Sequence, residues 1–201
     1  MSLLAAPPVQ GVAPTLEPYP GPRPFRVEEQ QLFFGRKTES LNLRDLVLSY
    51  PVTVLYAQTG AGKSSLVNAG LCPLLKEAGL DEVRVSRVGG QLPRGLVSQQ
   101  ISNVFVYNAI SQFLEAESKP GAAPEGVRDL KDLDLVSHLR VAWVQKPRLL
   151  IFDQFEELFT AYPECWQKRQ EFFQKLNGAL EGDKSRNLPP DEDLHILFVI
   201  R

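Results

Sequence analysis

The sequence predicts an α/β fold with a mainly parallel sheet, and two observations support this prediction. Short apolar runs that are typical of strands alternate along the chain with longer stretches of helical periodicity. The runs at 149–152 and 194–200 are almost wholly apolar, as buried strands of a parallel sheet require. We expect right-handed crossovers to connect the strands.

The first third of the chain is predicted to contain a lead-in, two helices and one strand. Residues 1–24 are rich in proline and carry little charge, which indicates an extended or disordered lead-in, and residues 25–201 form the domain. A turn at 32–36 enters a helix over 37–49 that Tyr50-Pro51 ends. A strand over 52–57 follows. The next helix runs from 62 to about 70, breaks near Gly70 and Pro73, and continues as a short turn to Ala78.

The remaining elements alternate in the same way. The alternating run at 83–88 predicts a second strand, which Gly89-Gly90 ends. We expect a loop over 91–98, a helix over 101–117, a linker over 119–126 and a helix over 130–145. The third strand spans 148–153, a helix spans 164–180, and a charged loop over 181–193 leads to the fourth strand at 194–200.

Composition excludes several classes of protein. The 201 residues are 43% hydrophobic and carry a net charge of −2, so no basic surplus indicates a nucleic-acid partner. Cys72 and Cys165 lie far apart in sequence and are expected to be reduced thiols, not a disulfide framework or a zinc site. The sequence shows neither an apolar stretch of membrane-spanning length nor a convincing signal peptide, so we expect a cytoplasmic protein.

Residues 56–65, YAQTGAGKSS, join the first predicted strand to a helix and resemble a Walker A phosphate-binding loop. Glycines at 60 and 62 let successive N–H groups turn toward an anion, and the helix start adds its positive dipole end. Lys63 would reach the β- and γ-phosphates, and the Ser64 hydroxyl would ligate Mg²⁺. Alanine stands where the first glycine of the motif is usual. The predicted nucleotide contacts are Ala57, Gln58, Thr59, Gly60, Ala61, Gly62, Lys63, Ser64 and Ser65.

An acidic cluster follows the third predicted strand and resembles a Walker B segment. Asp153 would hold Mg²⁺, through a water and together with the Ser64 hydroxyl. Glu157, or alternatively Glu156, would orient the attacking water, with a slight preference for Glu157. The competing explanation for both glutamates is a solvated helix start, where the helix dipole favours acids.

The spacing of the two motifs places a constraint on the sheet. One predicted strand separates Lys63 from Asp153, which is typical of P-loop NTPases whose fourth strand lies between the first and the third. Arg201 would then lie at the tip of the fourth strand, where it could contact the γ-phosphate or relay its loss. The alternative is an arginine that simply meets water at the end of a core strand.

Four segments in order carry a resemblance to a family: 18–25 (PYPGPRPF), 32–36 (LFFGR), 60–71 (GAGKSSLVNAGL) and 153–160 (DQFEELFT). Together they resemble the bacterial novel STAND NTPase domain, a signal-transduction ATPase related to NACHT and apoptotic types, over residues 18–201. The resemblance implies a three-layer P-loop sandwich of the additional-strand type. It also implies bound ATP or ADP with Mg²⁺, slow hydrolysis and a switch function. Residues 34–36 match a segment that packs near the adenine, and Arg36 would contact either the nucleotide or the following helix.

The resemblance also implies partners that this sequence does not contain. Family members carry a winged helix, C-terminal sensor repeats and an effector domain, and their ATP-bound forms oligomerise in defence or regulatory signalling. We therefore expect an incomplete domain that is truncated after the fourth core strand. The missing fifth strand would leave the strand at 52–57 as an exposed edge, so we also expect the protein either to self-associate or to be only marginally stable.

Two other functions stay open at this point. A small P-loop kinase or a GTPase would also use Lys63 and Ser64, but neither an arginine-rich lid nor a guanine-recognition motif is evident. The other alternative is an interaction module that binds nucleotide without turnover.

Overall fold

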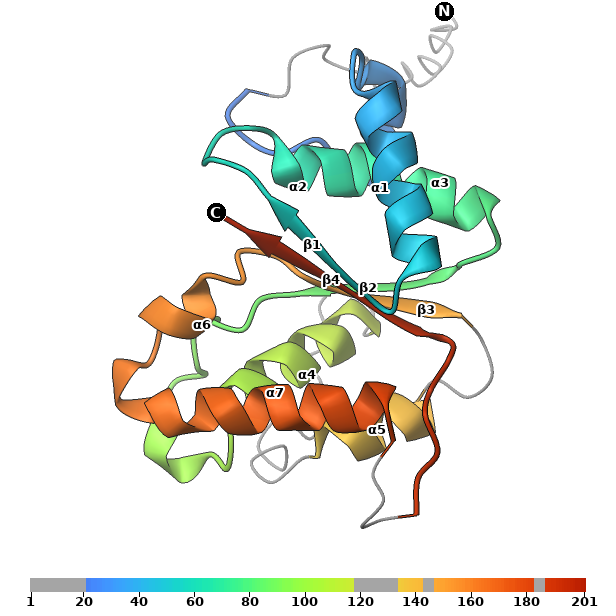
Figure 1. Ribbon diagram of the computed structural model, residues 1–201. Coiled ribbons are helices and arrows are strands. Elements are labelled where there is room, and N and C mark those ends of the chain that lie inside the picture. The colour runs from blue at the N-terminus through green and yellow to red at the C-terminus, as the bar shows by residue number, and fades with distance from the viewer. Residues whose placement is uncertain (1–20, 118–133, 143–146, 183–186) are drawn as a thin grey trace, which may run out of the picture.

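The computed structural model describes residues 21–117, 134–142, 147–182 and 187–201. In this part of the chain, four strands form one parallel sheet in the order β1-β4-β3-β2 (Figure 1). Their bounds are β1 Val52–Tyr56, β2 Glu82–Ser86, β3 Arg148–Phe152 and β4 Leu194–Ile200. The α/β class and the parallel sheet are as predicted. Of the predicted lead-in over 1–24, residues 1–20 lie outside the described residues, as does the predicted linker over 119–126. Residues 21–24 are described and line a pocket of the domain, so the predicted boundary at residue 25 falls too late.

The strand register brings the ends of the first, third and fourth strands together. Tyr56 pairs with Ile200, and Phe198 pairs with Phe152. The fourth strand therefore lies between the first and the third, as the spacing of the motifs predicts, and β1 is an edge strand within the described part of the sheet. Because the strands are parallel, the loops that follow β1 and β3 both leave from the carboxyl ends of the strands and meet there.

The second strand ends at Ser86, two residues earlier than predicted. Beyond Ser86, side chains of α4 (Val104–Glu117) form hydrogen bonds with the backbone of residues 87–90, in place of a neighbouring strand. Gln112 both accepts from the Arg87 N–H, at 2.9 Å, and donates to the Arg87 carbonyl, at 2.8 Å. Asn108 Nδ2 donates to the carbonyls of Val88 and Gly90. Alternation alone does not distinguish such a segment from a strand.

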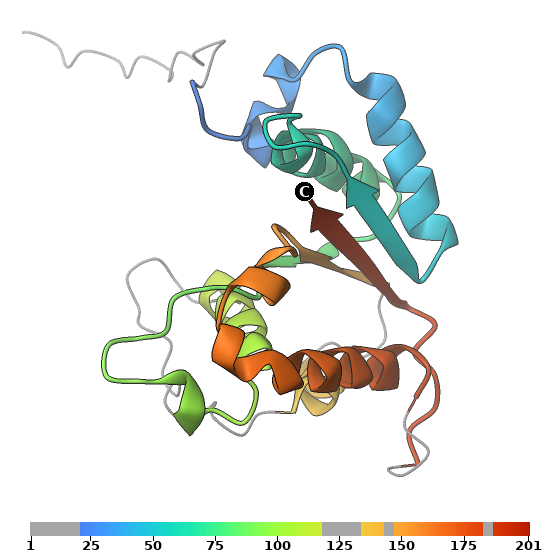
Figure 2. The ribbon, with the colours of Figure 1, turned by 60° about the vertical axis from the view of Figure 1, so that its left-hand side comes forward.

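One face of the sheet is covered by the helices around the glycine-rich loop. These are the 3₁₀ helix Val27–Leu32, α1 (Lys37–Ser49), α2 (Lys63–Ser65), the π-helical segment Leu66–Leu71 and α3 (Cys72–Glu77) (Figure 2). Their apolar side chains pack on β3 and β4 through Leu149, Ile151, Leu197 and Val199. The helix over 37–49 has the predicted bounds.

The helix after the loop does not break near Gly70, which corrects that prediction. It widens into the π-helical turn and continues as α3 to Glu77. Pro73 lies in the first turn of α3, where the missing N–H of a proline is tolerated. The glycine at 70 is explained by packing, because a Cβ there would lie 2.3 Å from Ser40 Oγ of α1.

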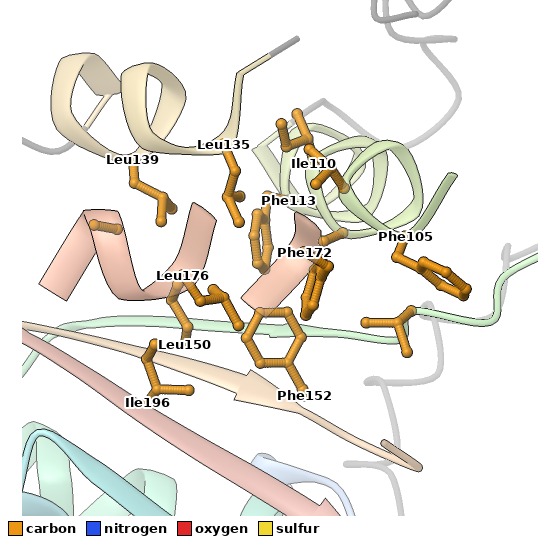
Figure 3. Packing of buried hydrophobic residues seen from close by; sticks show 14 of the residues in the cluster. Phe105, Ile110, Phe113, Leu135, Leu139, Leu150, Phe152, Phe172, Leu176 and Ile196 are labelled. Atoms are coloured by element: carbon orange, nitrogen blue, oxygen red, sulfur yellow. The ribbon is translucent and has the colours of Figure 1, made fainter. Parts of the chain in front are cut away.

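The opposite face carries α4, α5 (Leu135–Ala142) and α7 (Trp166–Leu180) over a phenylalanine-rich core (Figure 3). Phe172 of α7 meets Phe152 of β3 edge to face, with ring centroids 5.7 Å apart. The helix α4 starts at Val104, three residues later than predicted, because Asn103 Oδ1 accepts the N–H groups of Phe105 and Val106 and so caps it. The ends of the predicted helix over 130–145 lie partly outside the described residues.

Two further differences concern short elements. The predicted helix over 164–180 begins as a 3₁₀ turn, Pro163–Cys165, before α7 starts at Trp166. A single helical turn, α6 (Glu157–Thr160), follows β3 closely. It agrees with the helix start given as the competing explanation for Glu156 and Glu157, although the sequence did not predict its bounds. Neither it nor the 3₁₀ helix Val27–Leu32 is long enough to show a clear periodicity.

Candidate functional site

The loop after β1 has a backbone suited to binding an anion. Gly60 and Gly62 adopt left-handed φ angles of 81° and 82°, which residues with a Cβ rarely adopt. Lys63 begins the helical run that continues to Glu77. Its Nζ donates to the carbonyls of Ala57, at 2.6 Å, and Gln58, at 3.0 Å, so the ammonium group lies across the loop.

A serine–aspartate pair joins this loop to the end of β3. Ser64 Oγ lies 3.0 Å from Asp153 Oδ2, although 89 positions separate the two residues in the chain. Asp153 is held from both sides, since its N–H donates to the Ser86 carbonyl and its Oδ1 accepts the N–H of Gln154. Gln154 has a φ of 52°, a left-handed conformation that is uncommon for a residue with a side chain. Such local strain is often found at functional sites.

The loop, the acidic strand end and an N-terminal segment enclose one pocket of about 500 Å³, within the usual range for small-molecule sites. Of the predicted site residues, it is lined by Thr59, Gly60, Gly62, Lys63, Ser64, Ser65, Asp153, Glu156 and Arg201. Residues 21–25 and Gln154 complete the wall. The predicted residues Ala57, Gln58, Ala61, Arg36 and Glu157 do not line this pocket.

The two neighbouring glutamates have different surroundings. Glu156 lines the pocket, and its carboxylate accepts the N–H of Arg201 at 3.2 Å. Glu157 begins α6 and packs against Gly89, since a methyl group on Gly89 would lie 2.6 Å from Glu157 Cβ. Glu157 Oε2 is buried and has no hydrogen-bond partner among the described residues. The geometry therefore favours Glu156 for a role in the pocket, against the slight preference for Glu157.

Arg201 lies at the end of β4, as predicted, and lines the pocket. Its Nε is 3.9 Å from Glu156 Oε1, a loose ion pair between partly exposed side chains. Exposed pairs of this kind contribute little to stability, on the order of 0–1 kcal/mol. Exchange of Glu156 for a bound anion at the Arg201 guanidinium would therefore cost little stability.

A second pocket of about 560 Å³ adjoins the first and shares part of its lining. Phe34 and Arg36 line it together with Ala61, and Phe25, Gly60, Gly62 and Ser65 line both pockets. Arg36 Nη2 lies 3.4 Å from the Ala61 carbonyl, and its Nη1 lies 3.3 Å from Glu39. The ring of Phe34 is 81% exposed, which leaves an aromatic face available for stacking.

The residues present fit a magnesium ion that is shared with a phosphate chain. Mg²⁺ is usually bound through one or two protein oxygens, with substrate phosphates and waters as its other ligands, and the Ser64–Asp153 pair supplies such oxygens. No cluster of three or more His, Cys, Asp or Glu side chains suitable for a metal occurs in the described ranges. Cys72 and Cys165 are free, and burial raises the pKa of the Cys72 thiol to about 11.

Sequence reasoning did not place residues 21–25 in the site, although the segment 18–25 was part of the family resemblance. Phe25 N–H donates to Ser65 Oγ, and Asn68 Nδ2 donates to the Phe25 carbonyl, both at 3.2 Å. These two bonds fasten the segment to the helix that follows the loop. Its position in the sequence, far from the glycine-rich loop, gave no signal of this contact.

These features define a parallel α/β protein in which a glycine-rich loop and an acidic strand end share one pocket. A family model described as novel STAND NTPase 1 matches residues 18–201, and the chain belongs to this family. No curated protein and no solved structure matches the chain. Within the described residues, no helix is long and apolar enough to cross a membrane.

Proposed function

We propose that this chain is the nucleotide-binding switch of a STAND-type signalling or defence protein, which binds ATP or ADP with Mg²⁺ and hydrolyses ATP slowly. The observation that supports this most directly is the Ser64–Asp153 hydrogen bond in the same pocket as Lys63. The strand order is compatible with a P-loop sandwich of the additional-strand type. We further propose a cytoplasmic location, in keeping with the composition.

The loop and the helix start hold the phosphate chain. The backbone N–H groups around Gly60 and Gly62 face the anion, and Lys63 would exchange the carbonyls of Ala57 and Gln58 for the β- and γ-phosphates. The purine would lie in the adjoining pocket, beside Phe34 and Arg36, which line it. Ser64 and Asp153 would hold the metal, which would supply positive charge to neutralise the phosphate oxygens.

Hydrolysis needs a group that positions water in line with the bond between the γ-phosphorus and its bridging oxygen. Glu156 lines the pocket and is our candidate; its carboxylate would accept a proton from the water as the water oxygen attacks and the bridging oxygen leaves with ADP. Arg201 would stabilise the charge on the γ-phosphate. Loss of that phosphate would return Arg201 to Glu156, which links hydrolysis to β4.

A second candidate function is nucleotide binding without turnover in this chain alone. It is favoured by the contact between Glu156 and the Arg201 N–H, which occupies the proposed base. We propose that residues of another domain or of a second copy complete the site. Sensor and effector domains in a longer chain would then set the stimulus and the output.

The binding step is tested by thermal melting with Mg-ATP, Mg-ADP or Mg-GTP, with Lys63→Ala as the control variant. At a hundredfold excess over the dissociation constant, a ligand adds about 2.7 kcal/mol, which is a rise in Tm of about 5–10 °C for a chain of this size. We expect the rise with adenine nucleotides only and its loss in Lys63→Ala. A folded wild-type protein that shows no rise would refute the proposal.

The hydrolytic step is tested in single-turnover assays with Glu156→Gln and Glu157→Gln as a matched pair. We expect Glu156→Gln to lower the rate about 100-fold or more with binding retained, as for a general base. Glu157→Gln should leave the rate within a few fold of wild type. A larger loss with Glu157→Gln would transfer the role to that residue, and no hydrolysis by the wild type would favour the binding module.

A further inference from the structure

The N-terminal segment 21–25 (GPRPF), here called the strap, supplies an arginine to the proposed phosphate pocket. Arg23 lines the pocket together with Lys63 and Arg201. Both flanking residues are prolines, Pro22 and Pro24, which fix the backbone φ on either side of it. The strap is fastened to the helix after the loop through Ser65 and Asn68, so Arg23 is presented from a stiff support.

The guanidinium of Arg23 contacts the Glu29 carboxylate, and its Nη1 also donates to the Pro24 carbonyl at 3.1 Å. Its Nη1 lies 2.7 Å from Glu29 Oε2 and its Nη2 lies 2.5 Å from Glu29 Oε1, which is a two-point contact. Glu29 is itself fixed, because its Oε2 also accepts the N–H of Arg26 at 2.8 Å. The hydrogen bond from Arg23 is the main reason that the pKa of Glu29 is lowered to about 2.

A phosphate presents pairs of oxygens with a spacing close to that of a carboxylate. Arginine binds carboxylates and phosphates by the same planar fork of N–H donors, so either anion can occupy it. The Arg23 side chain is 41% exposed, while that of Glu29 is 14% exposed. Glu29 is therefore the more enclosed partner of the pair, and Arg23 is the partner that can turn toward the pocket.

We infer that Arg23 binds the phosphate chain of the nucleotide, and that Glu29 binds the Arg23 guanidinium when no nucleotide is present. The phosphate chain and the Glu29 carboxylate therefore compete for the guanidinium of Arg23. This inference rests on the proposed nucleotide site. Transfer of Arg23 from Glu29 to phosphate would displace the strap. The last residue of the strap, Phe25, is hydrogen-bonded to the helix that follows the loop. Nucleotide binding would thereby be reported to the chain that precedes residue 21.

The inference is tested by titrating Mg-ATP into the wild type, Arg23→Ala, Glu29→Gln and the double variant, at low salt and at neutral pH. Gln at 29 keeps an oxygen that can accept the Arg26 N–H but lacks the charge that competes for Arg23. We expect Arg23→Ala to weaken binding about tenfold and Glu29→Gln to tighten it about threefold to tenfold. In the Arg23→Ala background, Glu29→Gln should have no effect on affinity.

Arg26→Ala is the matched control, since it removes an arginine three positions away that does not line the pocket. Melting without nucleotide shows whether each variant is folded. If Glu29→Gln weakens binding as much as Arg23→Ala does, the pair only supports the strap and the inference is wrong. It is also wrong if Arg23→Ala binds like the wild type while Lys63→Ala does not, a result that would leave the proposed function intact. No binding by the wild type would overturn both.

Discussion

The contact between α1 and the π-helical segment gives the sharpest test of how the site is supported. A methyl group at position 70 would lie 2.3 Å from Ser40 Oγ and 3.2 Å from Ser40 Cβ. Ser40 is only 5% exposed, and its hydroxyl donates to the Arg36 carbonyl at 2.8 Å. Gly70→Ala must therefore displace the hydroxyl or push α1, which carries Arg36 at its start, away from the loop helix.

The free energy of unfolding should fall by about 2 kcal/mol in Gly70→Ala. Overpacking of a core contact costs about 1–3 kcal/mol. The loss of a hydrogen bond from a buried hydroxyl adds about 1 kcal/mol. Replacing glycine by alanine in a helix returns about 1 kcal/mol. For a chain of this length the net change corresponds to a fall in Tm of about 4–8 °C.

A double-mutant cycle in urea separates this contact from other effects of the substitution. Ser40→Ala removes the hydroxyl that the new methyl group would strike, so Gly70→Ala should cost less in that background than in the wild type. We expect a coupling free energy of about 1 kcal/mol or more. The packing argument would be refuted if the losses in the free energy of unfolding caused by Gly70→Ala and Ser40→Ala are additive within about 0.5 kcal/mol. It would also be refuted if Gly70→Ala is as stable as the wild type.

Three further outcomes are expected. In Asp153→Asn the nucleotide-induced rise in Tm should be the same in Mg²⁺ and in EDTA, whereas the wild type should differ between them, because Asp153 and Ser64 are the proposed metal ligands. Phe172→Ala should lower the free energy of unfolding by about 3–5 kcal/mol in urea, and Phe173→Ala, at a half-exposed site, by clearly less. The carboxyl of Glu29 should titrate by NMR near pH 2. The pKa of Glu29 in the folded protein lies below the ordinary value of 4.5, so its contribution to stability is complete above pH 4.5 and is lost as the pH falls from about 4.5 to about 2. In Arg23→Ala the midpoint of the Glu29 titration should return toward pH 4.5.

The strands and the loop could be predicted because their signals are local. The apolar runs at 149–152 and 194–200 predict buried strands directly, and the left-handed positions of the loop are marked by its own glycines at 60 and 62. The strand order followed from the spacing of two motifs. The end of the second strand was not predictable in this way, because Gln112 and Asn108, more than 15 positions further along, replace the strand partner.

The strap illustrates the same limit for the site. Nothing near Arg23 in the sequence indicates that Ser65 and Asn68 will bind the backbone of Phe25. Side-chain contacts over 40 or more positions depend on the full tertiary arrangement, so only the wall of the finished pocket shows which residues belong to it.

The choice between Glu156 and Glu157 depends on the direction in which each side chain leaves the turn after β3. The sequence determines this direction only in part. Phe155 and Leu158 are both buried, and three positions apart they define the inward side of the turn after β3. The two glutamates between them must then diverge to either side of that direction, and periodicity cannot say which side faces the loop. The side is set by the left-handed Gln154 and by the ring of Phe155, whose centroid is 4.3 Å from that of Phe198 in β4. Since β4 lies between β1 and β3, this anchor turns Glu156 toward Arg201 and the pocket and leaves Glu157 against Gly89.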